Sequence, residues 1–369
     1  MIEKALEKLT FLQYRHPYMI LMIVLVFTLL LGIGLKDIQL EGNFEEEMPQ
    51  HLPIFLLNDR VNDAFSGEDT IFVLFQLKDV NMKEVPKDIL DPAIMDYVVR
   101  LEETLSYESS IDDVVSVAPV VRQIKQANPS YTSQDMHSAL MNSGLDSFVS
   151  DDRTKMIMML KADVGMGNEG IIALTDLLNE KLDGLSKPPG TEITITGSPS
   201  ILKVILELLE FDSVFTLLVA FVIIFFLLVI IQRSFTQAGV ISVPLLLGII
   251  WTGGTLGWLG VKISIATAGL GAMLLGLGVE YGVFMISRYK EERAKKRSQK
   301  KALSTAVPAV GSAVLGSGTT TIVGFLALTF SIMPMMQHLG FSLALGIFYC
   351  IIAAVVVEPV IMLFEEGLK

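Results

Sequence analysis

The sequence has a single cysteine and few charged residues for its length. Cys350 lies within an apolar run, so no intrachain disulfide can stabilise any part of the 369-residue chain. Charged residues make up 18% of the chain and hydrophobic residues 51%, a balance typical of a protein with lipid-embedded segments. The net charge of −12 argues against nucleic acid as a partner, because an acidic protein repels phosphates.

The residue patterns of common catalytic and cofactor sites are also missing. We find no Ser-His-Asp arrangement, no cluster of metal ligands and no glycine-rich phosphate loop, and His51 and His137 are isolated. We therefore expect no enzymatic activity, no cofactor and no metal.

The acidic residues are concentrated in one segment. The chain has 40 Asp and Glu residues, of which 9 lie outside residues 37–210, so that 31 lie within them. The rest of the chain is almost free of charge apart from its loops. We expect residues 37–210 to form a solvent-exposed domain outside the membrane and the flanking regions to lie in the membrane.

Six apolar runs are long enough to cross a bilayer, which needs roughly 20 helical residues. The predicted spans are Pro17–Leu35, Phe211–Ile231, Ala238–Leu259, Ile263–Ser287, Val307–Ile332 and Leu339–Phe364. Because the first run is long and lacks a small-residue cleavage site, we interpret it as a retained helix over residues 17–36 rather than a signal peptide. Residues 211–364 then contain the other five spans.

Basic residues predict the orientation of these spans. The loop at 288–306 begins RYKEERAKKRSQKK, and the N-terminus contributes Lys4, Lys8 and Arg15. With six spans these segments share one side, which we predict to be cytoplasmic together with the tail at 365–369. Residues 37–210 are then extracytoplasmic, and the protein is a multi-pass protein of the cytoplasmic membrane.

The first residues have an amphipathic pattern. Apolar residues recur at helical spacing at Ile2, Ala5, Leu6, Leu9 and Leu12. This pattern favours a helix over residues 1–16 that lies at the inner interface, although a cytosolic extension fits equally well.

The acidic segment alternates between strand and helix periodicity. Strands are predicted at Thr70–Leu77, Asp112–Ala118, Lys155–Asp163 and Glu192–Thr196. Helices are predicted at Ile54–Phe65, Pro92–Tyr107, Gln134–Asn142 and Glu169–Leu185. The order gives two βαβ units separated by a helical insert, so the expected fold is an extracytoplasmic α+β domain of ferredoxin-like type beside six transmembrane helices.

Glu280 is the most informative polar residue of the spans. An ionisable side chain at the centre of a membrane helix costs about 2.5–3.5 kcal/mol unless it faces a protein interior or water. Burial favours the protonated acid, so Glu280 can load and release a proton. The alternative is an ion pair with Arg288 or Lys290. Glu358 in the last span is expected to snorkel or to pair with the basic loop, and His338 to lie at the outer interface.

Small and hydroxyl-bearing residues mark two neighbouring spans. Gly278 and Gly282 form a GxxxG pair, which favours close helix packing. In the fifth span Ser317, Thr319, Thr320 and Thr321 either bond the backbone of their own helix or extend a polar path toward Glu280.

The arrangement of one span, an external α+β domain and five further spans resembles half of a resistance-nodulation-division (RND) transporter. Three motifs in particular are similar to the mycobacterial membrane protein large and hydrophobe/amphiphile efflux-3 groups: TGSPSI at 196–201, GLGVEYGVFMISRYKEE at 276–292 and SGTTTIVGFLAL at 317–328. The resemblance implies a proton relay at Glu280 with Tyr281 beside it, although aspartate is the usual residue there.

The same resemblance implies a homodimer, because full-length members contain two such halves, and it implies export of lipids or other amphiphiles. A lipid- or sterol-sensing protein that transports nothing, and an accessory subunit of the Sec export channel, are the alternatives.

Overall fold

A computed structural model describes residues 2–42, 47–57, 60, 69–78, 86–162 and 167–367. These residues form two compact units. We call Met1–Gln50 with Glu207–Lys369 the helical unit, and His51–Leu206 the α+β unit.

The helical unit contains six helices that are long and apolar enough to cross a bilayer, among the residues that the structure describes. Each predicted span overlaps one of these helices, and the chain is a polytopic helical membrane protein. Its helices are α1 (Ile2–Arg15), α2 (Pro17–Ile33), η1 (Gly34–Asp37), α8 (Ser198–Gln232), α9 (Phe235–Trp258), α10 (Leu270–Ala294), α11 (Gln299–Ala327), η3 (Leu328–Phe330), α12 (Pro334–Ile352), the π-helix η4 (Ala353–Val357) and α13 (Glu358–Gly367).

The spans differ from prediction at their ends. α10 begins seven residues later than predicted, because Ile263–Ser264 is a short strand, β6, that pairs in parallel with β1 (Leu40–Glu41). The second span was predicted to begin at Phe211, but α8 already begins at Ser198 and contributes residues to both units. A proline in the first turn is compatible with a helix start there.

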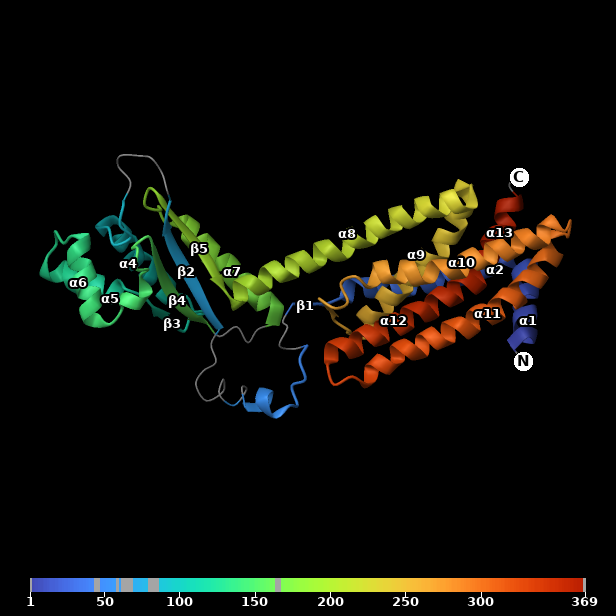
Figure 1. Cartoon of the computed structure of the whole chain (residues 1–369), viewed down its shortest axis with the longest axis horizontal. Helices are drawn as coiled ribbons and strands as arrows, with labels where there is room; N and C mark the ends of the chain where they lie inside the picture. The colour runs from blue at the N-terminus through green and yellow to red at the C-terminus, as the bar shows by residue number, and fades with distance from the viewer. Residues whose placement is uncertain are drawn as a thin grey trace. The chain divides into compact units, whose positions relative to one another are not determined.

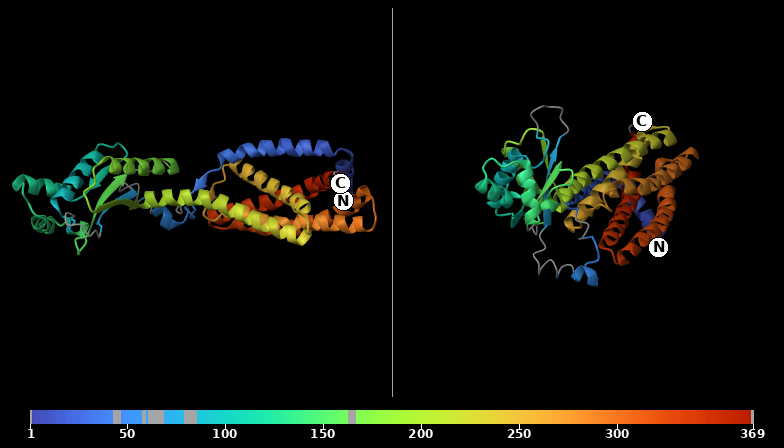
Figure 2. Two further views of the ribbon diagram at one scale, coloured as in Figure 1. Left: turned by 90° about the horizontal axis from the view of Figure 1, so that it is seen from above. Right: turned by 60° about the vertical axis from the view of Figure 1, so that its left-hand side comes forward.

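Helices α9, α10, α11 and α12 run side by side, and α2 packs on α9 (Figures 1 and 2). The contact between α2 and α9 is close because it is made by glycines. A Cβ on Gly254 would lie 1.9 Å from the Leu31 carbonyl oxygen, and a Cβ on Gly257 would lie 1.9 Å from that of Gly34. Within the helical unit, both termini and the turn between α10 and α11 lie at one end (Figure 1).

The α+β unit is built on a four-stranded antiparallel sheet of order β3-β4-β2-β5. Its strands are β2 (Asp69–Leu77), β3 (Asp113–Val115), β4 (Lys155–Ala162) and β5 (Thr191–Gly197). Its helices are α4 (Pro92–Ser106), α5 (Ala118–Ala127), α6 (Ser133–Ser143) and α7 (Gly167–Gly184), with a 3-10 turn η2 (Asp146–Phe148).

The core of the α+β unit lies between the sheet and helices α4 and α7. Alternate side chains of β2 and β4 are buried, as expected for strands with one covered face. Leu101 and Leu105 of α4 and Leu178 of α7 are buried as well. At the end of β5, Gly197 has φ 121°, and a Cβ there would lie 2.5 Å from the Thr70 carbonyl oxygen, so only glycine fits.

Most predicted elements of this unit are confirmed, with one omission. The predicted strand Asp112–Ala118 is only three residues long, because Pro119 in the first turn starts α5 at Ala118. The insert therefore contains two helices rather than one. Of the predicted helix Ile54–Phe65, residues 54–57 and 60 are helical and the remainder lies outside the described residues.

Candidate functional site

Helix α10 positions the acid and the tyrosine singled out by sequence. Glu280 lies roughly 15 Å along the axis from Leu270, near the middle of the helix. Successive residues are 100° apart on a helix, so Glu280 and Tyr281 point in different directions. Tyr281 is 1% exposed and lies in the core of the bundle, whereas Glu280 is exposed on the surface of the chain.

Glu280 has no ion-pair partner among the described residues, and the two cations proposed for it are engaged elsewhere. Arg288 contacts Glu291 at 2.6 Å, and Lys290 donates to the side-chain oxygen of Gln232 at 2.7 Å. The alternative interpretation, an ion pair of Glu280 with Arg288 or Lys290, therefore has no support among the described residues.

The hydroxyl groups of α11 bond their own helix. Thr319 donates to Leu315 O at 2.5 Å, Thr320 and Thr321 donate to Ser317 O at 2.6 and 3.2 Å, and Ser317 donates to Val314 O at 3.4 Å. Ser317, Thr319 and Thr320 are nevertheless exposed, so α11 presents a polar surface. These contacts match the backbone-bonding interpretation.

A groove of about 620 Å³ runs between α10 and α11, on the side of α11 that carries Ser317. Phe284, Ser287, Arg288 and Glu291 line it from α10, and Ala309, Val310, Ala313, Val314 and Ser317 line it from α11. Glu280 lies four residues before Phe284, so it shares the helix face of this groove. We call this surface, with Glu280, the α10–α11 groove.

The glycine pair of α10 packs toward other helices. A Cβ on Gly278 would lie 2.9 Å from Leu245 and 3.0 Å from Cys350 Sγ. A Cβ on Gly282 would lie 3.1 Å from the Oε2 atom of Glu358. The absent side chains let α9, α12 and α13 approach α10.

The structure contradicts the prediction made for Glu358. It was expected to snorkel or to pair with the basic loop, but it is 0% exposed, and neither of its carboxylate oxygens has a partner among the described residues. The helices around it cover it completely, so its side chain cannot reach the interface. Sequence position within the last span did not indicate this, because a hydrophobic run does not tell which of its faces is buried.

Helix α1 brings a second buried polar group to this region. Gln13 is fully buried and its Nε2 donates to Val355 O at 2.8 Å and to Val356 O at 3.1 Å, both in the π-helix. The buried face of α1 consists of Leu6, Thr10 and Gln13, whereas Ile2, Ala5 and Leu12 of the predicted stripe are exposed. The predicted helix is confirmed, and its position at the membrane interface stays a prediction. The helical spacing of Leu6, Thr10 and Gln13 in the sequence could have indicated this buried face.

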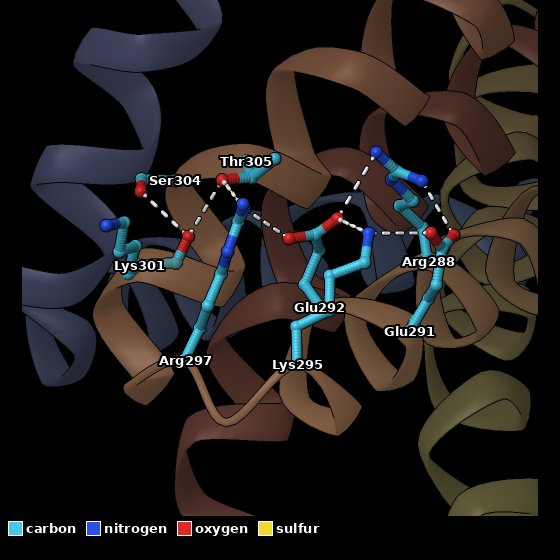
Figure 3. Close-up of polar contacts among 8 residues, drawn as sticks. All are labelled: Arg288, Glu291, Glu292, Lys295, Arg297, Lys301, Ser304 and Thr305. Atoms are coloured by element: carbon cyan, nitrogen blue, oxygen red, sulfur yellow. Dashed lines mark hydrogen bonds and ion pairs between the residues drawn. The ribbon is translucent and has the colours of Figure 1, made fainter.

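The charged turn between α10 and α11 is tied together by its own ion pairs. Glu292, buried at 1% exposure, contacts Arg288 at 3.3 Å and Lys295 at 2.8 Å, and it also bonds Arg297 (Figure 3). Arg297 further donates to the Thr305 hydroxyl of α11 at 3.3 Å (Figure 3). Three of the basic residues of this loop, Arg288, Lys295 and Arg297, are thus paired with Glu291 or Glu292.

Two further acids are buried in the helical unit near β1 and α12. Glu41 of β1 pairs with Lys262 at 2.5 Å. Glu47 lies 3.7 Å from Nδ1 of His338. Among the residues that the structure describes, no three His, Cys, Asp or Glu side chains are grouped as a metal site would require.

Comparison with known proteins identifies the family of this chain. The MMPL family model matches residues 87–365. A membrane protein of Methanocaldococcus jannaschii is 32% identical over 369 residues, which cover 99% of this chain and 95% of that protein. The siderophore exporter MmpL5 of Mycobacterium tuberculosis is 27% identical over 202 residues, 53% of this chain. The apo-petrobactin exporter of Bacillus anthracis is 32% identical over 110 residues, 29% of this chain. The aligned regions cover only 20% and 14% of these two exporters.

Proposed function

The chain belongs to the MMPL family of the RND superfamily, and from this membership we infer that it is a membrane transporter of the RND type. Two of its relatives are named as exporters, one of a siderophore and one of apo-petrobactin. We propose that it exports lipids or other amphiphilic molecules and that a proton gradient drives the export. The observation on which the proposal rests is Glu280 with Tyr281 near the middle of the membrane helix α10.

We propose that two copies of the chain form the working transporter. An exposed acid in a membrane helix would cost about 2.5–3.5 kcal/mol against lipid, and a second protein surface removes that cost. Gly276, Gly316 and Gly324 add to the argument, because a Cβ on any of them would meet nothing within 4 Å, which leaves room for a close helix contact. In this arrangement the α10–α11 groove faces the partner copy, and Glu280 lies inside the assembly.

The α+β unit is proposed to be a ferredoxin-like porter-type domain. Its strand order and antiparallel pairing support this, since two βαβ units give the same order. We further propose that the protein lies in the cytoplasmic membrane with both termini inside. The shared location of the termini and the basic α10–α11 turn supports that orientation.

Transport by the purified full chain in proteoliposomes tests the mechanism. With Nile red and an NBD-labelled phospholipid as probes, the wild type should move a probe only when a pH gradient is imposed. Glu280→Gln should abolish this movement without loss of expression or assembly, whereas Glu3→Gln, at an exposed acid of α1, should not change it. Normal transport by Glu280→Gln would remove the relay from the proposal. Probe binding without any gradient dependence would favour a sensor.

Cysteine cross-linking tests the dimer. Since Cys350 is the one native cysteine, Cys350→Ala gives a background without thiols. Gly276→Cys, Ala313→Cys and Thr320→Cys are placed in or beside the α10–α11 groove, and Met22→Cys on exposed α2 is the control. We expect cross-linked dimers from at least one groove variant and none from Met22→Cys. Cross-linking at Met22 alone would place the contact on another face.

A further inference from the structure

Glu358 is a buried acid of the helical unit that the proposed relay does not use. Glu358 is the first residue of α13 and directly follows the π-helix η4. It is 0% exposed, and both of its carboxylate oxygens lack a hydrogen-bond partner among the described residues. Its Oε2 atom lies 3.1 Å from the position that a Cβ on Gly282 would take, so the small residue of α10 leaves room for the carboxyl group.

Among the residues that the structure describes, no cation is paired with Glu358. Helix α9, which contacts α13, contains no titratable residue. The buried titratable side chains on the other helices packed against this segment are Tyr281, Tyr289 and Glu292 on α10 and Cys350 on α12. Glu292 is already held by three cations, and none of the four is bonded to Glu358. An ionised carboxylate without a partner would cost several kcal/mol here, so the packed bundle favours the neutral acid.

The surroundings fit a proton better than a metal cation. A sodium or divalent ion needs several oxygen ligands, and the carbonyls of Val355 and Val356 just before Glu358 are already bonded to Gln13. A neutral carboxylic acid needs no such cage. The π-helix is also a feature that occurs frequently at functional sites.

We propose that Glu358 is a proton-binding site of the helical unit, neutral while α13 is packed against Gly282 and ionised only when water reaches it. The step moves one proton between the carboxyl group and water and changes no other bond. Gln13 is a positioning residue, because it fixes the π-helix that precedes the acid. Glu280 and Gly282 are about 200° apart around α10, so the two acids lie on opposite sides of that helix. The inference rests on the proposed proton-driven function for its role in transport.

Infrared spectroscopy of the full chain in lipid nanodiscs tests the protonation directly. The wild type should show the C=O stretching band of a neutral carboxylic acid at neutral pH, and the band should be lost only at high pH. Glu358→Gln should remove this band, and Glu280→Gln should leave it in place. Glu358→Asp, which keeps the acid on a shorter side chain, should shift the band rather than abolish it. If Glu358→Gln does not assemble, the shift in Glu358→Asp tests the assignment instead.

Three results would overturn the assignment. The first is a band that is unchanged in Glu358→Gln. The second is a Glu358→Asp variant whose spectrum equals that of the wild type. The third is a band that sodium chloride titrates away at fixed pH while choline chloride does not, which would make the site a sodium site. For Gln13 we expect Gln13→Leu to shift the pH midpoint of the band, and an unchanged midpoint would remove its positioning role.

The transport assay separates this inference from the proposed function. If the wild type transports Nile red with a pH gradient and Glu358→Gln does so equally well, the coupling role of Glu358 is wrong while the proposed function stands. If the wild type shows the band but no gradient-dependent transport, the proton site stands and the proposed function is wrong. Loss of gradient-driven transport in both Glu358→Gln and Glu280→Gln supports a two-acid pathway.

Discussion

Glu102 of the α+β unit and Glu358 of the helical unit are buried acids with opposite surroundings. In the α+β unit, Glu102 is buried but satisfied, since Arg122 lies 2.5 Å from one carboxylate oxygen and the Ser116 hydroxyl bonds the other. In the helical unit, Glu358 is buried more deeply than Glu102 and has no partner among the described residues. Partners of this kind stabilise a fold, whereas an acid left without them destabilises it and indicates a functional role.

The units also differ in how their elements are held together. The α+β unit packs apolar side chains between a sheet and two helices, while α2 and α9 of the helical unit approach each other through glycine backbone. Hydrophobic burial tolerates small changes in side-chain volume, but a backbone contact tolerates none. The following substitutions test both differences, beginning with the largest expected effect.

Gly254→Ala should cause the greatest loss of stability. The new Cβ would lie 1.9 Å from the Leu31 carbonyl oxygen, so α2 and α9 must separate, at a cost of about 3 kcal/mol or more. Gly239→Ala on the same helix is the matched control, because its Cβ meets nothing within 4 Å. The thermal midpoint in mild detergent measures both. Equal midpoints for the two variants would show that glycine contacts do not hold this unit together.

Replacing the two buried acids with methionine should change stability in opposite directions. Glu102→Met leaves Arg122 and Ser116 without their partner and should destabilise the chain by about 2 kcal/mol. Glu358→Met removes an unsatisfied acid from an apolar core and should stabilise it by about 1–2 kcal/mol. Thermal midpoints of the two variants in one detergent give the comparison. A loss of stability in both would mean that Glu358 has a structural partner after all.

Glu292→Gln tests a paired acid within the helical unit itself. Its three cations are each more than a third exposed, so solvent screens them and the expected loss is only about 1 kcal/mol. The loss should shrink in high salt because ions screen the pairs. Thermal midpoints at low and high salt, with Glu291→Gln at the more exposed neighbouring acid as control, measure it. A salt-independent loss would argue against an electrostatic role.

Asp152→Asn should have the smallest effect, and only in a defined pH range. The Ser150 hydroxyl donates to Asp152 at 2.6 Å and, with the Thr154 amide and hydroxyl, lowers the pKa of Asp152 to about 2. A pKa below the ordinary value of 3.8 means that this carboxylate stabilises the fold above about pH 4, and that the contribution is lost as pH falls toward 2. Circular dichroism melts should therefore show wild type and Asp152→Asn differing at pH ~6 and converging at pH ~2. A constant difference would contradict this explanation.

Much of the fold could be predicted from local sequence pattern. The six spans follow from apolar length, and the strands of the α+β unit from alternation, because one face of each is buried. Helix α5 was missed since its start at Ala118 interrupts a run that reads as strand. The start of α10 was misplaced since pairing of Ile263–Ser264 with β1 depends on a segment far away in the sequence.

The candidate site was only half accessible from sequence. The motif around Glu280 and Tyr281 and the family resemblance could be recognised from the sequence alone. The burial of Glu358 and the hydrogen bonds of Gln13 were not, because they depend on contacts of α13 with α10 and of α1 with the π-helix η4, which are far apart in the sequence.

The sequence by itself determined that this is a six-span membrane protein of the RND type with an acidic α+β segment, because hydrophobic length, charge and motifs are local properties. Only the tertiary structure decided which acid faces outward and which lies in the core. Helix periodicity places residues on faces, but the packing of neighbouring helices decides which face is covered. Glu280 is thus exposed and Glu358 enclosed, although both lie in helices of the same apolar kind.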